Sequence, residues 1–221
     1  KHAQANRVDV HLLRHADHIE LRIEDDGPGI LETAAINNRQ KEMGYNAAKE
    51  LLTQLGYPFA VLTIHVPEQQ AVGEDAATYV ERLAGDKARA GWQACGGALP
   101  VLGADTIVVL DEQVLEKPRD QQDAERMLTA LSGRQHQVMT AVAVAGATGV
   151  SVTLVTTEVT FRVLSAKEIT EYWHTGEPAD KAGSYGIQGL AGKFVSRIEG
   201  SYTAVVGLPL LETDLLLQQY L

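Results

Sequence analysis

The sequence predicts an α/β protein, and three observations support this fold class. From about residue 45 onward, segments with helical spacing of apolar residues alternate with segments of strand-like spacing. Of the 221 residues, 45% are hydrophobic, which is enough to bury a substantial core. No internal repeat, low-complexity stretch or Ser- or Pro-rich linker interrupts this part of the chain. We therefore expect one α/β body over residues 41–221.

The first 40 residues differ from the rest and are predicted to be a separate segment. Apolar residues alternate with polar ones over residues 8–12 and again over residues 19–23. The run Asp25-Asp26-Gly27-Pro28-Gly29 then closes the second segment. This pattern is typical of a two-stranded hairpin followed by a glycine loop.

The elements of the α/β body follow in order from spacing and from breaker residues. Apolar residues three and four apart indicate helices, which glycines end, and short apolar runs indicate buried strands. Asp120 is expected to cap one helix, and Ser165 with Glu168 forms a capping-box signature at the start of another. The predicted helices are residues 47–55, 75–93, 124–131, 165–176 and 211–217, and the predicted strands are residues 59–66, 101–110, 137–145 and 155–163.

Charge and composition restrict the partners. The net charge of −10 argues against a protein that coats a nucleic-acid backbone, whereas a small anionic ligand remains compatible, with a metal ion to bridge it to an acidic site. No apolar run reaches the roughly 18 residues of a membrane span, and the first thirty residues are charged, unlike a signal peptide. We expect a cytoplasmic protein without a membrane partner.

Two charged residues interrupt apolar patterns and are candidate site residues. Asp105 falls inside the run Val101–Val109, which otherwise reads as a central strand. A buried, unpaired carboxylate costs several kcal/mol, so Asp105 must pair with a cation, cap backbone amides or hold a metal. Lys87 lies four residues after Leu83 on the core-facing side of its helix, where it needs an anion or lays its stem over the core edge.

Two further motifs carry weaker signals by themselves. Glu116-Lys117-Pro118-Arg119-Asp120 is a charged turn before a helix, and such turns are usually only turns. The glycine-rich segment 180–189 lacks the strand-to-helix context of a Walker loop. Its glycines suit a loop that lies against a ligand, and Gln188 offers both a donor and an acceptor to a nucleobase edge.

Taken together, these motifs resemble those of the Maf family. The resemblance extends over about residues 45–221 and is strongest for the subgroup that hydrolyses dTTP and UTP. It is carried by Gly103-Ala104-Asp105-Thr106, Glu116-Lys117-Pro118-Arg119-Asp120, Ala130-Leu131-Ser132-Gly133, residues 180–189, Gly200-Ser201-Tyr202 and Val205-Val206-Gly207-Leu208-Pro209.

The resemblance implies a fold, an activity and partners. The fold is a two-lobed α/β structure with a long mixed sheet and a central cleft. The implied enzyme is a nucleoside triphosphate pyrophosphatase, a homodimer that cleaves a triphosphate to the monophosphate and pyrophosphate with Mg²⁺ or Mn²⁺.

The resemblance also assigns roles to residues. It makes Asp105 the general base, Lys87 and Lys117 phosphate-contacting cations, and Glu68 a further acidic site residue. Asp105 and Glu68 would hold the metal. Thr106 and Gln188 fall where the family discriminates the base.

The chain departs from the family at one loop. Where the family has Ser-x-Ser-Pro-Arg-Arg, this chain has Met43-Gly44-Tyr45-Asn46-Ala47-Ala48. The loss of both arginines and both serines predicts weaker triphosphate binding and slower chemistry. The alternative function is therefore a catalytically silent nucleotide-binding or scaffolding protein.

Residues 6–30 resemble a different family, namely a fragment of the ATP-binding domain of histidine kinases. In such a domain Asp26 would meet the adenine, but the asparagine helix and the glycine lid are missing from this chain. An alternative is that residues 19–24 supply the first strand of the Maf-like sheet.

Overall fold

The computed structural model describes residues 8–14, 19–25 and 48–220. The chain divides into two compact units, Lys1–Ile64 and His65–Leu221, which are described separately. In the first unit, β1 (Val8–Arg14) and β2 (Ile19–Asp25) pair antiparallel, with Val8 opposite Asp25. This confirms the predicted hairpin strands, whereas the glycine loop at residues 26–29 lies outside the described residues. Residues 48–54 are helical, as predicted.

The strand predicted over residues 59–66 is wrong. Residues 57–71 have no regular secondary structure, and Phe59 is 40% exposed. A strand needs a neighbour for its backbone N–H and C=O groups, and none of the described strand pairs includes residues 59–66. Its apolar run therefore lacks the pairing that would make it a strand.

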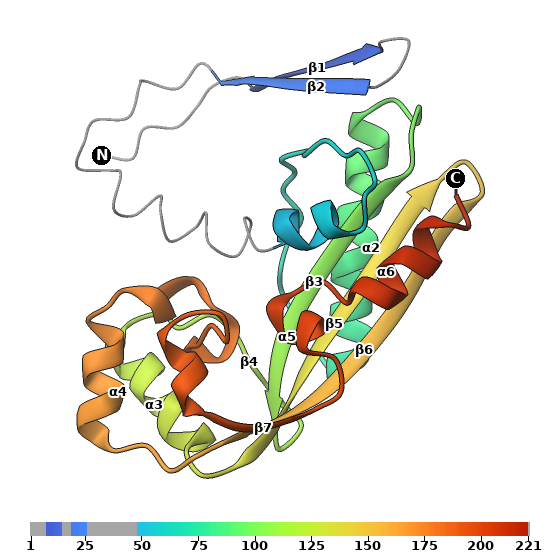
Figure 1. The fold of residues 1–221 in the computed structure, drawn as a ribbon. Coiled ribbons are helices and arrows are strands. Elements are labelled where there is room, and N and C mark those ends of the chain that lie inside the picture. The colour runs from blue at the N-terminus through green and yellow to red at the C-terminus, as the bar shows by residue number, and fades with distance from the viewer. Residues whose placement is uncertain (1–7, 15–18, 26–47, 221) are drawn as a thin grey trace. The chain divides into compact units, whose positions relative to one another are not determined.

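The second unit is built on one five-stranded sheet with the order β4-β3-β5-β6-β7 (Figure 1). Every pair among these strands is antiparallel, which differs from the mixed sheet that was expected. The strand β2 pairs with β1 and is not part of this sheet. The strands are β3 (Val101–Leu110), β4 (Gln113–Leu115), β5 (Gln135–Gly146), β6 (Gly149–Phe161) and β7 (Val195–Glu199).

One face of this sheet is covered by α2 (Ala76–Ala94). Asp75 caps the start of this helix, and its carboxylate accepts the Thr78 N–H at 2.9 Å. The helix approaches β3 very closely at Gly103. A Cβ atom at this position would lie 2.6 Å from the Ala84 carbonyl oxygen and 2.6 Å from the Ala88 nitrogen. The absence of a side chain at Gly103 thus permits the close contact between helix and strand.

The opposite face is covered by short C-terminal helices. Figure 1 shows α5 (Tyr202–Val206) and α6 (Leu210–Leu217) on the side of the strands away from α2. The Thr140 hydroxyl of β5 donates to the Ala204 carbonyl of α5 at 2.7 Å, which fixes this helix on the sheet. The helix predicted at the C-terminus is confirmed and begins at Leu210.

A second cluster of helices packs around one end of the sheet. It contains α3 (Gln121–Leu131) and α4 (Ala166–Trp173), with the 3-10 turns η2 (Glu177–Asp180), η3 (Ala182–Ser184) and η4 (Leu190–Phe194). The predicted caps are confirmed at Asp120 and at Ser165 with Glu168. Because Asp120 caps it, α3 begins at Gln121, three residues before the predicted start.

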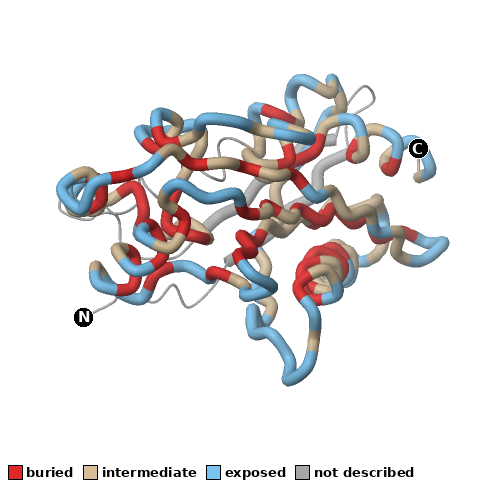
Figure 2. Tube along the Cα trace, turned by 90° about the horizontal axis from the view of Figure 1, so that it is seen from below, coloured by how far each residue is buried: buried red, intermediate tan, exposed pale blue. Residues whose placement is uncertain are grey.

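Two hydrophobic clusters hold the second unit together, in agreement with two lobes. One joins α2 to β3 and β5 through residues such as Leu83, Ile107 and Ala141. The other joins α3, α4 and the 3-10 turns to the sheet through residues such as Leu128 and Phe161. Buried residues accordingly concentrate on the central strands and on α2 in Figure 2. Val163, predicted within a strand, follows the end of β6 and is 77% exposed.

Within the residues that the structure describes, no helix is both long and apolar enough to cross a lipid bilayer.

Candidate active site

Asp105 lies in the middle of β3, as predicted, on the face that α2 covers. It shares this face with Gly103 and Ile107 because side chains two residues apart on a strand point the same way. The Asp105 side chain is 15% exposed, and Ala141 of β5 is its partner in the register. A carboxylate among apolar neighbours requires a cation.

Lys87 supplies that cation from α2. It projects from the helix one turn beyond Leu83, and its Nζ donates a hydrogen bond to Oδ1 of Asp105. The same ammonium lies 2.8 Å from Oε1 of Glu68. Two carboxylates therefore share one ammonium. Of the two alternatives expected for Lys87, the structure shows the anionic partner and not a stem that only covers the core edge.

Glu68 links this pair to the charged turn after β4. Its second oxygen, Oε2, lies 3.3 Å from the Nζ of Lys117, whose side chain is 59% exposed. Glu68 comes from the irregular segment before α2, and Lys117 follows β4. The structure thus brings four predicted residues into one alternating chain of charges: Asp105, Lys87, Glu68 and Lys117.

Burial and charge act in opposite directions on these groups. Burial raises the pKa of Asp105, and this effect outweighs the lowering by Lys87. For Lys87, burial lowers the pKa, but Asp105 and Glu68 together raise it above its usual range. Burial would raise the pKa of Glu68, yet Lys87 and Lys117 lower it overall. Asp105 is therefore the better proton acceptor of the two carboxylates.

Thr106 points away from this network. It follows Asp105 on the strand, so its side chain lies on the opposite face, where its hydroxyl lies 2.9 Å from that of Thr140. A Cβ atom at Gly207, which follows α5, would lie 3.7 Å from the hydroxyl oxygen of Thr106. The structure does not bring Thr106 to Asp105 on one face of the sheet.

Gln188 is exposed in the glycine-rich loop between η3 and η4. This loop begins on the Thr106 face, because a Cβ atom at Gly183 would lie 2.9 Å from Val108, two residues beyond Thr106. The two predicted substrate-binding residues, Thr106 and Gln188, thus belong to one side of β3, whereas the four charged residues are linked on the other.

One contact next to the charged network, between Tyr79 and Glu116, was not predicted from the sequence. The Tyr79 hydroxyl donates to Oε1 of Glu116 at 3.1 Å, which ties α2 to the turn that carries Lys117. Burial and the neighbouring carboxylates raise the pKa of Tyr79, so its hydroxyl stays protonated. A tyrosine on the core-facing side of α2 indicates that its hydroxyl needs a hydrogen-bond partner, but residue spacing does not identify Glu116 as that partner.

The donor set suits a hard divalent cation. Mg²⁺ is usually bound by one or two carboxylates together with substrate phosphates and water. Asp105 and Glu68 meet at one ammonium and could supply those two carboxylates. No group of three or more His, Cys, Asp or Glu side chains in metal-binding arrangement occurs among the described residues. The remaining ligands would therefore come from substrate and water.

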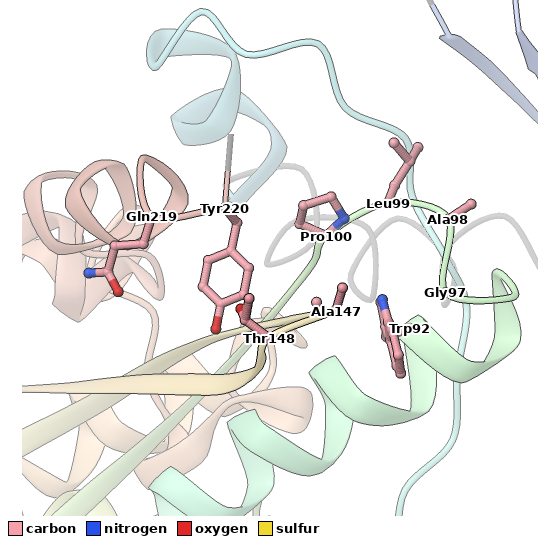
Figure 3. A pocket seen from close by; sticks show the side chains of 10 residues that line it. Trp92, Gly97, Ala98, Leu99, Pro100, Ala147, Thr148, Gln219 and Tyr220 are labelled. Atoms are coloured by element: carbon pink, nitrogen blue, oxygen red, sulfur yellow. The ribbon is translucent and has the colours of Figure 1, made fainter.

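A separate cavity of about 390 Å³ lies at the start of β3, and none of the predicted site residues lines it (Figure 3). Its walls come from Trp92, residues 97–100, the β5–β6 turn and Tyr220. The lining holds no Asp, Glu, Lys, Arg or His, so this cavity lacks the charges that a triphosphate requires.

The fold and the charged network define the class to which the chain belongs. It is a member of the Maf-like protein family, whose model matches residues 47–220. The match includes all six predicted site residues and excludes the hairpin of β1 and β2.

Curated relatives share more than half of their aligned residues with this chain. A dTTP/UTP pyrophosphatase of Photobacterium profundum is 58% identical over an alignment of 179 residues, with 78% of this chain and 91% of the relative covered. The dTTP/UTP pyrophosphatase of Vibrio cholerae is 59% identical over 172 residues, with 78% and 92% covered. That of Yersinia pestis is 60% identical over 173 residues, with 78% and 88% covered.

Proposed function

We propose that this protein hydrolyses the nucleoside triphosphates dTTP and UTP to the monophosphate and pyrophosphate. The observation that carries the proposal is the alternating network of Asp105, Lys87, Glu68 and Lys117. A network of this kind pairs a base with cations for a polyphosphate. Similarity to relatives named dTTP/UTP pyrophosphatase supports the substrate class.

In this mechanism, Asp105 accepts a proton from a water molecule. The water oxygen forms a bond to the α-phosphorus, and the bond from that phosphorus to the oxygen bridging to the β-phosphate breaks. The products are the monophosphate and pyrophosphate. Lys87 and Lys117 neutralise the negative charge that develops on the leaving pyrophosphate. The raised pKa of Asp105 suits this role because a more basic carboxylate accepts a proton more readily.

Asp105 and Glu68 are the residues that would hold Mg²⁺ or Mn²⁺. When bound, such an ion supplies polarisation of the α-phosphate and charge neutralisation. The Lys87 ammonium contacts both of these carboxylates, so it would lie beside an ion that they held and beside the phosphates of the substrate.

The base preference is the first prediction. Thr106 and Gln188 lie on one side of β3, and we expect them to favour dTTP and UTP over ATP. A hydrogen-bonding site for one base rejects another because its polar groups are left unpaired. Pyrophosphate release from each triphosphate, with Mg²⁺ and with Mn²⁺, measures this preference as a ratio of kcat/KM.

Two outcomes would contradict that prediction. Equal turnover of ATP and dTTP would refute the base preference and point to Asp26, in which case Asp26→Asn should reduce ATP turnover. Stabilisation by nucleotide in a thermal shift without any pyrophosphate release would favour the alternative, a silent nucleotide-binding or scaffolding protein. The absence of the arginine loop is the observation that favours this alternative.

The missing loop gives a second prediction. Residues 43–47 lie outside the described residues, and Ala48, where the second arginine would stand, begins the described helical segment. Writing Ser-x-Ser-Pro-Arg-Arg over residues 43–48, with an apolar strand before it, should raise kcat/KM by on the order of 100-fold. Each hydrogen bond to a charged group contributes roughly 1.5–3 kcal/mol, and two arginines supply at least two.

The matched control for this experiment carries the same loop with glutamine in place of both arginines. It keeps the loop length and should show little of the gain. An equal gain in both variants, or no gain in either, would refute the electrostatic explanation.

The proposal also includes assembly as a homodimer, location in the cytoplasm and no nucleic-acid partner. The net charge of −10 supports the last of these because nucleic-acid backbones repel an acidic surface. Sedimentation of the purified protein would measure the oligomeric state directly.

A further inference from the structure

Glu177 is a buried carboxylate that lies outside the charged network. It is the first residue of η2, it is 7% exposed, and three donors converge on it. The Tyr172 hydroxyl donates to Oε1 at 2.6 Å, the Leu190 N–H donates to Oε2 at 2.9 Å, and the Ala191 N–H lies 3.4 Å from Oε1. Since two of these donors are backbone groups of η4, Glu177 binds the segment that follows Gln188.

Tyr172 extends the same network to the segment that precedes Gln188. Its hydroxyl oxygen accepts the Gly186 N–H at 3.3 Å while its proton goes to Glu177. Burial and the Glu177 carboxylate raise the pKa of Tyr172, so the hydroxyl remains a donor. The Glu177–Tyr172 pair therefore holds the backbone on both sides of the short segment 187–189.

Gly189 shows how closely the carboxylate approaches this segment. A Cβ atom at Gly189 would lie 2.3 Å from Oε1 and 2.4 Å from Oε2 of Glu177. Such distances exclude any side chain, so residue 189 must be glycine as long as Glu177 keeps its position. The buried carboxyl group of Glu177 thus lies directly against Gly189, the residue next to Gln188.

The beginning of the glycine-rich loop has its own attachments. The Gly183 N–H donates to the Glu116 carbonyl at 3.3 Å, and the Tyr185 hydroxyl lies 2.8 Å from Nε2 of buried His136. Gln188 itself is exposed and has no hydrogen bond to the described part of the chain. The backbone that carries Gln188 therefore sets the point from which its side chain extends.

We propose that Glu177, together with Tyr172, is a positioning residue for nucleobase recognition: the pair fixes the backbone from which Gln188 contacts the base. This inference rests on the proposed function, which gives Gln188 its base contact. Glu177 contributes through its two acceptor oxygens, because each of them accepts hydrogen bonds. Glutamine has nearly the same shape but would point an NH₂ group at a donor.

The decisive experiment is a double-mutant cycle between Glu177→Gln and Gln188→Ala. Its measured quantity is the ratio of kcat/KM for UTP to that for ATP. We expect Glu177→Gln to reduce this ratio on the order of tenfold, with a smaller loss for Tyr172→Phe. In the Gln188→Ala background, Glu177→Gln should change the ratio by less than about twofold, because the contact it positions is already gone.

Glu171→Gln is the matched control, since Glu171 is on α4 and its side chain is 65% exposed. It makes the same chemical change and should leave the ratio and the melting temperature unaltered. A merely structural role for Glu177 would lower the melting temperature and total activity but leave the ratio unchanged. That result, or an equal loss of the ratio with and without Gln188, would overturn the inference.

Amide hydrogen exchange tests the pair without any substrate. The N–H groups of Gly186, Leu190 and Ala191 should exchange at least about tenfold faster in Glu177→Gln than in the parent protein, whereas amides of α2 should not change. Unchanged exchange at these three positions would refute the positioning role. A parent protein that cleaves no triphosphate would instead refute the proposed function, and the exchange result would still decide whether Glu177 holds the loop.

Discussion

Asp105→Asn is expected to reduce kcat/KM for dTTP and UTP by on the order of 100- to 10,000-fold. General-base catalysis contributes an effect of this size, and an amide cannot accept the proton of the attacking water. The substitution preserves the shape of the side chain in β3. It removes the charge that Lys87 pairs with, so the ammonium keeps only Glu68 as a partner. Initial rates of pyrophosphate release measure the loss.

The control for this variant is Asp111→Asn, at the turn after β3. The Asp111 side chain is 66% exposed and pairs with Arg134 at 2.7 Å, away from the charged network. It should retain the parent rate. If Asp105→Asn hydrolysed dTTP or UTP as fast as the parent while remaining folded, Asp105 would not be the base.

Lys87→Met is expected to reduce kcat/KM by about 100- to 1,000-fold, which is the usual loss for one preorganised donor that stabilises a developing negative charge. Methionine keeps most of the length of the buried stem and removes the ammonium. Asp105 and Glu68 then repel each other without a cation between them. Lys87→Arg keeps the charge and should lose less, and Lys167→Met, at a side chain that is 84% exposed, should lose nothing.

The pH profile of Lys87→Met provides an independent measurement. Burial already raises the pKa of Asp105, and Lys87 opposes that rise by stabilising the carboxylate. Removing Lys87 therefore raises the pKa of Asp105 further, so the base remains protonated to higher pH. The acid limb of kcat/KM should move to higher pH in Lys87→Met and stay near its parent position in Lys87→Arg. A shift towards lower pH would contradict the assignment of Asp105.

The central part of this site was predictable from the sequence because charged residues there interrupt apolar patterns. A carboxylate inside an apolar strand and a lysine on the apolar side of a helix both need partners, and they proved to be partners of each other. The strand was predicted with its observed bounds, since Pro100 precedes the apolar run and the charged pair Asp111-Glu112 follows it. Local rules suffice where pattern and burial agree.

Other parts of the site depend on contacts between distant segments, which spacing cannot show. Glu68 precedes Lys87 by nineteen positions in an irregular segment, and only the resemblance to a family indicated it. The hydrogen bonds of Glu177 were missed because a Gly-Glu-Pro sequence signals the end of a helix and does not indicate which amides will face the carboxylate. The opposite direction of Thr106 was predictable, because neighbours on a strand alternate between faces.

The close approach at Gly103 has a consequence for the strength of the charge network. Lys87 reaches Asp105 because α2 lies against β3 at the position where the strand has no Cβ atom, and Lys87 Cβ itself would be 3.1 Å from one placed there. The separation of the two layers is therefore set by a residue that carries no charge and touches no substrate. Coulombic attraction varies inversely with distance, so the thickness of this packing layer sets the reactivity of the carboxylate. In this protein the distance between α2 and β3, which Gly103 permits to be small, controls the strength of the attraction between Lys87 and Asp105.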